Sequence, residues 1–138
     1  MGISRYNMEG YADPTAHEAV CNIEKEVRKW RPVVYICSPF SSDPEGNTVK
    51  ARRYCRFAVD HGAIPLAPHL LLPQFMSENT ERELSLFMDM VFLGRCEELW
   101  VFGRNWSPGM QKEIAKAKKR NIRIRYFTEE MEERHDCQ

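Results

Sequence analysis

The segment VVYICSPFSSDPEGN, residues 33–47, decides the fold class. It opens with Val33–Cys37, which is entirely apolar and mostly β-branched or aromatic. That pattern is typical of a strand buried on both faces of a parallel sheet. The residues that follow are rich in Ser, Pro, Asp and Gly, so the strand passes into a loop at Ser38. A helix is expected next, with Asn47 or Thr48 as its N-cap.

The same alternation of short strands and helices continues to residue 127. Strands of about five residues that are joined by helices run parallel and are connected by right-handed crossovers. The sequence therefore predicts an α/β fold, a three-layer, doubly wound parallel sheet of four to five strands. The expected strands are 33–37, 63–67, 99–103 and 122–127, and the expected helices are 14–30, 47–61, 80–93 and 107–120, with a loop or short helix at 68–79.

Local signals set the ends of these elements. Asp13 is a good N-cap and precedes a proline, the residues TERE at 80–83 fit the capping-box pattern, and Ser107 precedes another proline. Pro65 places the second strand near an edge of the sheet, and the alternating apolar and basic residues at 122–127 also indicate an edge strand. In the helix at 47–61, the residues expected to face inward are Val49, Cys55, Ala58 and Val59.

Length and composition are those of one ordinary globular domain with extensions. The 138 residues are 43% hydrophobic and 29% charged. We expect an N-terminal extension with one helix at residues 1–31, the α/β domain at 32–127, and an acidic C-terminal tail at 128–138 that frays or forms one more helix.

Charge and targeting signals exclude several partners. Lys plus Arg and Asp plus Glu each number 20, so the net charge is zero, which argues against nucleic acid and polybasic membrane binding. No apolar run reaches the roughly 18 residues of a membrane span, and the N-terminus has no signal or lipidation motif. A cytoplasmic protein, in a bacterium or a phage-infected host, is therefore expected.

Motifs for metals and common cofactors are absent. The five cysteines and four histidines have no C-x-x-C or ligand spacing, so neither a disulfide framework nor a metal site is expected. Without a P-loop, a dinucleotide fingerprint or a nucleophile elbow, no cofactor is expected either. Doubly wound sheets bind ligands beyond the carboxyl ends of their strands, which here are followed by residues 38–47, 68–75 and 103–110.

One carboxylate, Asp89, lies in an apolar run. The residues LFMDMVFL at 86–93 are apolar on every side of the expected helix, and such a helix is buried. A lone ionised carboxylate there is costly unless it has a partner. Asp89 is therefore either a structural residue bonded to Tyr35 or to backbone amides, or a carboxylate tuned by burial for acid–base work or for holding a substrate hydroxyl.

A second carboxylate, Glu113, lies roughly 60° from Met110 around its helix, at the margin of the apolar stripe. It is either an i,i+3 partner of Lys116 on a solvated face or a site residue. The helix start SPGM, residues 107–110, either binds an anion through its free N–H groups or is an ordinary cap.

Two further features have both a functional and a structural interpretation. The basic cluster at 112–125 contains seven Lys or Arg residues; it either contacts phosphates or is a solvated face neutralised by the acidic tail. Trp106 either stacks on a base or covers the edge of the core.

Three motifs occur in a distinctive order: VYICSPF at 34–40, the helix with Asp89, and CEELWVFG at 96–103 followed by SPGMQKE at 107–113. This set resembles the nucleoside 2-deoxyribosyltransferase-like superfamily, which includes nucleotide N-glycoside hydrolases and related phage domains of unassigned function. The resemblance covers residues 32–127 and implies a flavodoxin-like sheet that binds a nucleoside or nucleotide.

The resemblance also implies roles for individual residues. In that family a glutamate on the helix after the third strand attacks the anomeric carbon and the base leaves. By motif match the nucleophile is Glu113, while Asp89 assists the sugar or the leaving base and Tyr35 orients the glutamate. Ser107 and Gly109 face the 5′ end or its phosphate. The substrate-binding residues expected are Ser38, Pro39, Phe40, Asn47, His69, Trp106, Ser107, Gly109 and Met110.

The sequence thus favours an N-glycosidic-bond hydrolase or deoxyribosyl transferase that acts on a small nucleoside or nucleotide. A catalytically silent phage module that binds or sequesters a nucleotide is the alternative. The resemblance implies sites closed by a neighbouring subunit, and the apolar residues 84–93 and 70–72 offer more surface than one thin sheet needs to cover. We therefore expect a homodimer or larger homo-oligomer.

Overall fold

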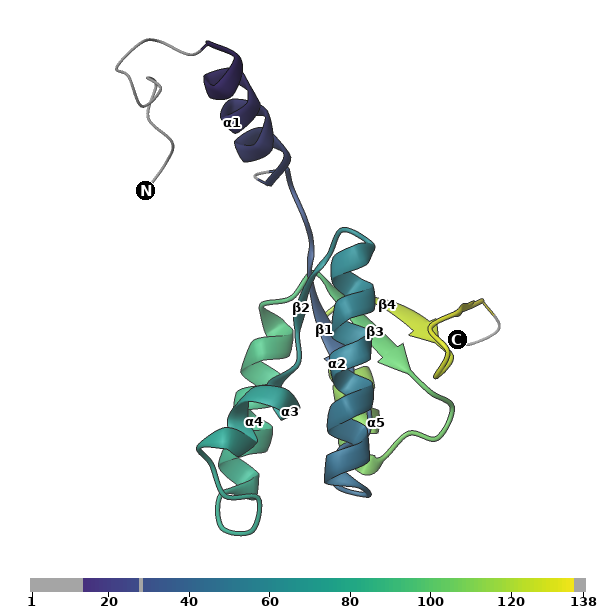
Figure 1. The fold of residues 1–138 in the computed structure, drawn as a ribbon. Coiled ribbons are helices and arrows are strands. Elements are labelled where there is room, and N and C mark those ends of the chain that lie inside the picture. Colours follow the sequence, from purple (N-terminus) through teal and green to yellow (C-terminus); the bar gives the residue numbers. More distant parts are fainter. Residues whose placement is uncertain (1–13, 28, 136–138) are drawn as a thin grey trace. The chain divides into compact units, whose positions relative to one another are not determined.

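The computed structural model describes residues 14–27 and 29–135, which fall into two compact units separated after Trp30 (Figure 1). The first unit contains helix α1, Pro14–Val27, in which the Cys21 thiol lies 3.7 Å from a ring nitrogen of His17. This helix ends before the predicted Trp30, and the predicted cap Asp13 lies outside the described residues.

The second unit, which begins at Arg31, is built on a five-stranded sheet in the order β2-β1-β3-β4-β5. The first four strands of that order are parallel, whereas β5 is antiparallel to β4. This is the order of flavodoxin-like sheets. The strands are β1 Val33–Cys37, β2 Ile64–Leu66, β3 Glu98–Phe102, β4 Arg123–Phe127 and β5 Glu133–Arg134.

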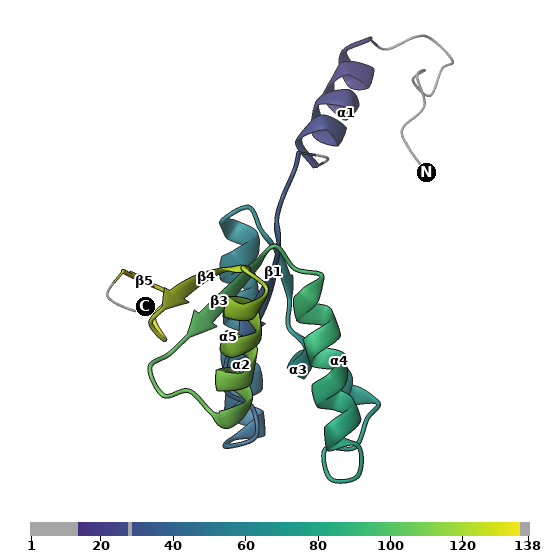
Figure 2. The same ribbon diagram turned by 180° about the vertical axis from the view of Figure 1, so that it is seen from behind.

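Strand β1 lies between β2 and β3 and is buried on both faces, as predicted. Because successive side chains of a strand point to opposite faces, Tyr35 and Cys37 enter one core cluster, and Val34 and Ile36 enter the other. Helices α4 and α5 contribute to the cluster that contains Tyr35, whereas α2 contributes to the cluster that contains Val34. Figures 1 and 2 show α2 and α5 over opposite faces of the sheet.

Helix α2, Pro44–Asp60, begins earlier than predicted. Its N-cap is Asp43, whose side chain accepts a hydrogen bond from the Gly46 N–H, and a proline follows at the first helical position. A cap at Asn47 or Thr48 is therefore wrong. The face of α2 that packs on the sheet also differs from the predicted one, since Val49 and Val59, predicted to face inward, are exposed. The buried residues of α2 are Asn47, Ala51, Tyr54 and Ala58.

After β2, the edge strand predicted from Pro65, the undecided segment forms α3, Pro68–Leu71, and the 3-10 helix η1, Leu72–Gln74. Helix α4, Arg82–Gly94, has Glu81 as N-cap but no capping hydrogen bond from a side chain, so the predicted capping box at 80–83 is wrong. The Glu81 carboxylate instead accepts from the backbone N–H of Ser77, which stabilises the preceding turn.

Helix α4 is also not buried all round. Leu84, Phe87 and Val91 are 47%, 65% and 42% exposed, respectively, because only one face of the helix reaches the sheet. Residues 86–93 are mostly apolar on every side of the helix, yet this pattern did not mean that α4 is fully buried. Leu84, Phe87 and Val91 instead form an apolar stripe on the surface.

Helix α5, Pro108–Lys119, starts as predicted, with the Ser107 hydroxyl accepting from the Met110 N–H at 3.3 Å. The helix stops before Asn121, which has a φ of 56°. The tail does not fray or form a helix over its described part, because β5 pairs with β4 and covers the predicted edge. The guanidinium of Arg125 donates to both carboxylate oxygens of Glu133, which fixes this hairpin.

Candidate active site

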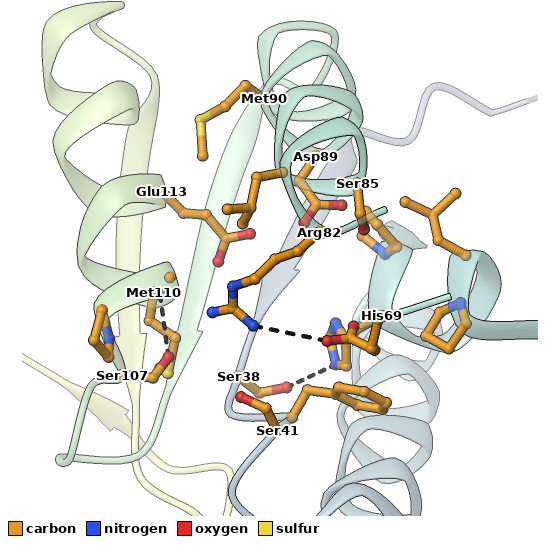
Figure 3. Close-up of a pocket in the computed structure, with 18 of the residues that line it drawn as sticks. Ser38, Ser41, His69, Arg82, Ser85, Asp89, Met90, Ser107, Met110 and Glu113 are labelled. Atoms are coloured by element: carbon orange, nitrogen blue, oxygen red, sulfur yellow. Dashed lines mark hydrogen bonds and ion pairs between the residues drawn. The ribbon is translucent and has the colours of Figure 1, made fainter. Parts of the chain in front are cut away.

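A pocket lies beyond the carboxyl end of β1, as expected for a doubly wound sheet (Figure 3). Strand β1 and its loop provide one wall, and α3, the first turns of α4 and the start of α5 provide the others. The lining residues are Tyr35, Ser38, Phe40, Ser41, Pro68, His69, Leu72, Pro73, Glu78, Arg82, Ser85, Leu86, Asp89, Met90, Ser107, Pro108, Gly109, Met110 and Glu113.

Glu113 enters this pocket from α5, one turn after the buried Met110. The Tyr35 hydroxyl donates a hydrogen bond to its Oε2, and the Cys37 thiol donates to its Oε1 over 3.3 Å. Burial raises the pKa of Glu113 to about 7, although both donors act to lower it. Among the described ion pairs none joins Glu113 to Lys116, so the surface-pair interpretation has no support.

Asp89 faces the same pocket from α4, and Figure 3 shows its carboxyl and that of Glu113 on facing helices. Burial, and then the charge of Glu78, raises the pKa of Asp89 to about 7. No hydrogen bond to Asp89 from a described residue contributes to that shift. The bond to Tyr35 in the structural alternative is not formed, since the Tyr35 hydroxyl donates to Glu113. Because the pKa of each carboxyl is about 7 and the charge of Asp89 further disfavours ionisation of Glu113, one of the two is readily protonated near neutral pH.

Ser38 and His69 form a neutral polar pair on the opposite wall. The Ser38 hydroxyl lies 3.0 Å from Nε2 of His69. Burial lowers the pKa of His69 to about 4, so the imidazole is uncharged at neutral pH. The ring of Phe40 lies edge-on to the imidazole, with 6.1 Å between the ring centroids. This wall offers aromatic surface and hydrogen bonds without charge.

Two charged lining residues, Glu78 and Arg82, were not predicted. Arg82 extends from α4 across the pocket toward α5, and its guanidinium lies 3.8 Å from the carboxylate of Glu78 (Figure 3). Nothing in their sequence pattern distinguishes them from ordinary surface residues at i,i+4 spacing. Only the placement of α4 and the turn before it beside the end of β1 brings them to the site.

Three predicted substrate-binding residues, Pro39, Asn47 and Trp106, line a neighbouring hollow that shares Ser107 with this pocket. Asn47 donates to the backbone carbonyl of Phe40 and to the Ser42 hydroxyl, and so holds the loop after β1 in place. Trp106 packs against the core and donates its indole N–H to a loop carbonyl, as in its structural interpretation. The other predicted residues, Ser38, Phe40, His69, Ser107, Gly109 and Met110, do line the pocket with Tyr35, Asp89 and Glu113.

The described residues show no metal centre or membrane span. Within 14–27 and 29–135, no group of three or more His, Cys, Asp or Glu side chains is placed to hold a metal ion. No helix in these ranges is both long and apolar enough to cross a membrane.

Comparison with known proteins assigns a family and a fold. A family model matches residues 32–127, the stretch that contains the sheet through β4 and the whole pocket. The chain belongs to this family, the domain of unknown function DUF7768. No curated protein sequence matches the chain.

A solved structure of similar fold is the 2-deoxyribosyltransferase from the psychrotolerant bacterium Bacillus psychrosaccharolyticus. The two share 19% sequence identity with a TM-score of 0.52, over 70% of this chain and 72% of that chain. The DUF7768 domain is therefore similar in fold to that enzyme, an α/β sheet flanked by helices.

Proposed function

We propose that residues 32–127 form a three-layer catalytic domain that breaks the N-glycosidic bond of a nucleoside or nucleotide, with Glu113 as nucleophile. The observation that carries this proposal is a buried carboxyl held at both oxygens by Tyr35 and Cys37 and facing a second carboxyl, Asp89, in one pocket. The fold likeness to a 2-deoxyribosyltransferase supports it.

The proposed reaction has two steps. An oxygen of Glu113 forms a bond to the anomeric carbon as the bond from that carbon to the base nitrogen breaks. The base leaves with the electrons of that bond and takes a proton from Asp89, whose pKa of about 7 keeps much of it protonated. Water or an acceptor base then attacks the glycosyl ester, gives its proton to Asp89 and releases Glu113 as carboxylate.

The pocket walls fit the two ends of such a substrate. Phe40 and the neutral Ser38–His69 pair offer a base aromatic contact and hydrogen bonds. The positive end of the α5 helix dipole, near Gly109, suits the oxygens at the 5′ end. The proposed catalytic residues are Glu113, Asp89 and Tyr35, and the proposed substrate contacts are Ser38, Phe40, His69, Ser107, Gly109 and Met110.

Incubation with deoxynucleosides and their 5′-monophosphates tests the proposal. We expect free base, detected by chromatography, from at least one member of the panel. A second base added in excess distinguishes the two chemistries, since a transferase forms a new nucleoside and a hydrolase leaves free sugar. Tight binding without base release from any member would instead support the silent nucleotide-binding module and reject the enzyme.

We also propose that the chain forms a homodimer or larger oligomer through α4. Its exposed residues Leu84, Phe87 and Val91 follow i, i+3, i+7 spacing and so form one apolar stripe. A second copy that presents the same stripe would cover it, and α4 also carries Asp89 and Arg82 to the pocket.

Phe87→Glu is expected to convert this oligomer into a 16.2 kDa monomer, as measured by light scattering at micromolar concentration, because the charge would be buried in the interface. The matched control is Phe75→Glu, since Phe75 is 67% exposed but does not belong to α4, and it should leave the oligomer intact. A wild-type protein that is already monomeric would reject the interface.

A further inference from the structure

We infer that Cys37 is a positioning residue for Glu113: its thiol is the second hydrogen-bond donor, which favours the ionised form of the carboxyl and orients it for attack. The Cys37 Sγ lies 3.3 Å from Oε1 of Glu113, and the sulfur is 4.0 Å from its other acceptor, the backbone carbonyl of Met110. Glu113 is therefore the closer partner. The inference rests on the proposed function, because it concerns the same nucleophile.

The placement of Cys37 follows from strand geometry. Tyr35 and Cys37 are two residues apart on β1, so their side chains point to the same face of the sheet. Each reaches a different oxygen of Glu113, with Tyr35 on Oε2 and Cys37 on Oε1. A carboxylate with one donor can still rotate about its last torsion, whereas two donors from one rigid strand fix the plane of the carboxyl group.

The two donors also oppose the forces that would neutralise Glu113. Burial and the facing Asp89 both favour its protonated form, whereas hydrogen bonds to the carboxylate favour its charged form. Burial raises the pKa of the Cys37 thiol well above its ordinary value, so the thiol keeps its proton and remains a donor. A thiol is a weak donor in water, but a hydrogen bond to a charged group in dry surroundings is stronger. Besides Cys37, which contacts Glu113 from β1, the titratable or charged side chains that line the pocket with Glu113 are Tyr35, His69, Glu78, Arg82 and Asp89.

The alternative is that Cys37 only fills space, as a buried cysteine commonly does. Cys96 provides the comparison within this chain. It is buried in the same core cluster, and its thiol lies 3.3 Å from the backbone carbonyl of Phe92 rather than from a carboxylate. Removing either thiol should have similar effects on packing, but only Cys37 should affect the ionisation of Glu113.

The first test is the pH profile of base release. Cys37→Ala should move the acidic limb upward by roughly half to one pH unit, since a hydrogen bond to the ionised form is lost. At a pH one unit below the wild-type limb the rate should be about three- to tenfold lower, and the difference should disappear at high pH. Cys37→Ser, which restores a donor, should return the limb to within a few tenths of a unit, and Cys96→Ala should not move it.

The second test does not depend on activity. In protein labelled with ¹³C at the glutamate carboxyls, the Glu113 signal is identified by its loss in Glu113→Gln, and its titration midpoint is compared in the same variants. An upward shift in Cys37→Ala but not in Cys96→Ala supports the inference even if no substrate is ever turned over. Equal midpoints in wild type and Cys37→Ala reject it, whatever the activity. Cys37→Val, which fills the space without a donor, replaces the alanine variant if that variant does not fold.

Discussion

Glu113→Gln is expected to lower the rate of base release by at least about three orders of magnitude, because the amide is not a nucleophile and no glycosyl–enzyme ester can form. The substitution preserves shape, and the amide oxygen can still accept the hydrogen bond from Tyr35. Folding should therefore be retained, as should binding of the nucleoside. The measurements are base release, a thermal melt and a direct binding titration on the same preparation.

Lys116→Gln is the matched control for that experiment, since it removes the charge with which Glu113 was alternatively expected to pair. If Glu113 were a surface residue, both substitutions would change the free energy of unfolding by only a few tenths of a kcal/mol and leave the rate intact. A Glu113→Gln protein with the wild-type rate would remove Glu113 from the mechanism.

The parts of the fold that were predictable are those encoded in short segments. The buried pattern of Val33–Cys37 indicates a central parallel strand, Pro65 indicates an edge, and Ser107 before a proline indicates a helix start; all three are confirmed. The sequence is less informative where it offers two possible N-caps for the same helix. Asp43 and Asn47 are both good caps, and the proline after Asp43 makes that start the more stable one.

The site was harder to predict, because its geometry depends on contacts between distant segments. The position of Glu113 at the margin of its apolar stripe was visible in the helical pattern, and the family resemblance implied its contact with Tyr35. Its bond to Cys37 joins residues 76 positions apart, and no local pattern indicated it. Arg82 reaches the pocket only because α4 lies over the end of β1. The apolar run at 86–93 was misleading because the burial of a helix depends on which distant segments pack against it, and this is not encoded in the run itself.

The role of Asp89 can be separated from that of Glu113 by pH. In the proposed mechanism Glu113 must be ionised and Asp89 protonated, so base release by the wild type should be bell-shaped around neutral pH, with apparent pKa values that belong to the pair. Asp89→Asn is expected to lower the maximal rate by about two orders of magnitude, because the leaving base loses its proton donor. It should also remove the basic limb of the profile, which a loss of packing alone would not do.

The same substitution should stabilise the folded protein at high pH. The pKa of Asp89 is about 7 in the folded state, against an ordinary value of 3.8. A raised pKa means that the favourable contribution of the protonated group is complete below about pH 4 and is lost as pH rises through 7. Asparagine has no proton to lose, so at pH 8 Asp89→Asn should be more stable than wild type by about 1–3 kcal/mol, and this gain should shrink toward pH 4.

Denaturant unfolding at pH 5 and pH 8 measures this difference directly. The pKa of His69 is lowered to about 4, so this residue makes the folded protein less stable as the pH falls below about 6.5. Because His69 is present in both proteins, its effect cancels in the comparison. Asp60→Asn is the control, since the hydrogen bond from Arg56 shifts the pKa of that exposed carboxyl downward, opposite to the shift of Asp89. Asp60→Asn should not gain stability at pH 8. If Asp89→Asn proves less stable than wild type at pH 8, Asp89 has a favourable partner when ionised, and its assignment as the proton donor to the leaving base fails.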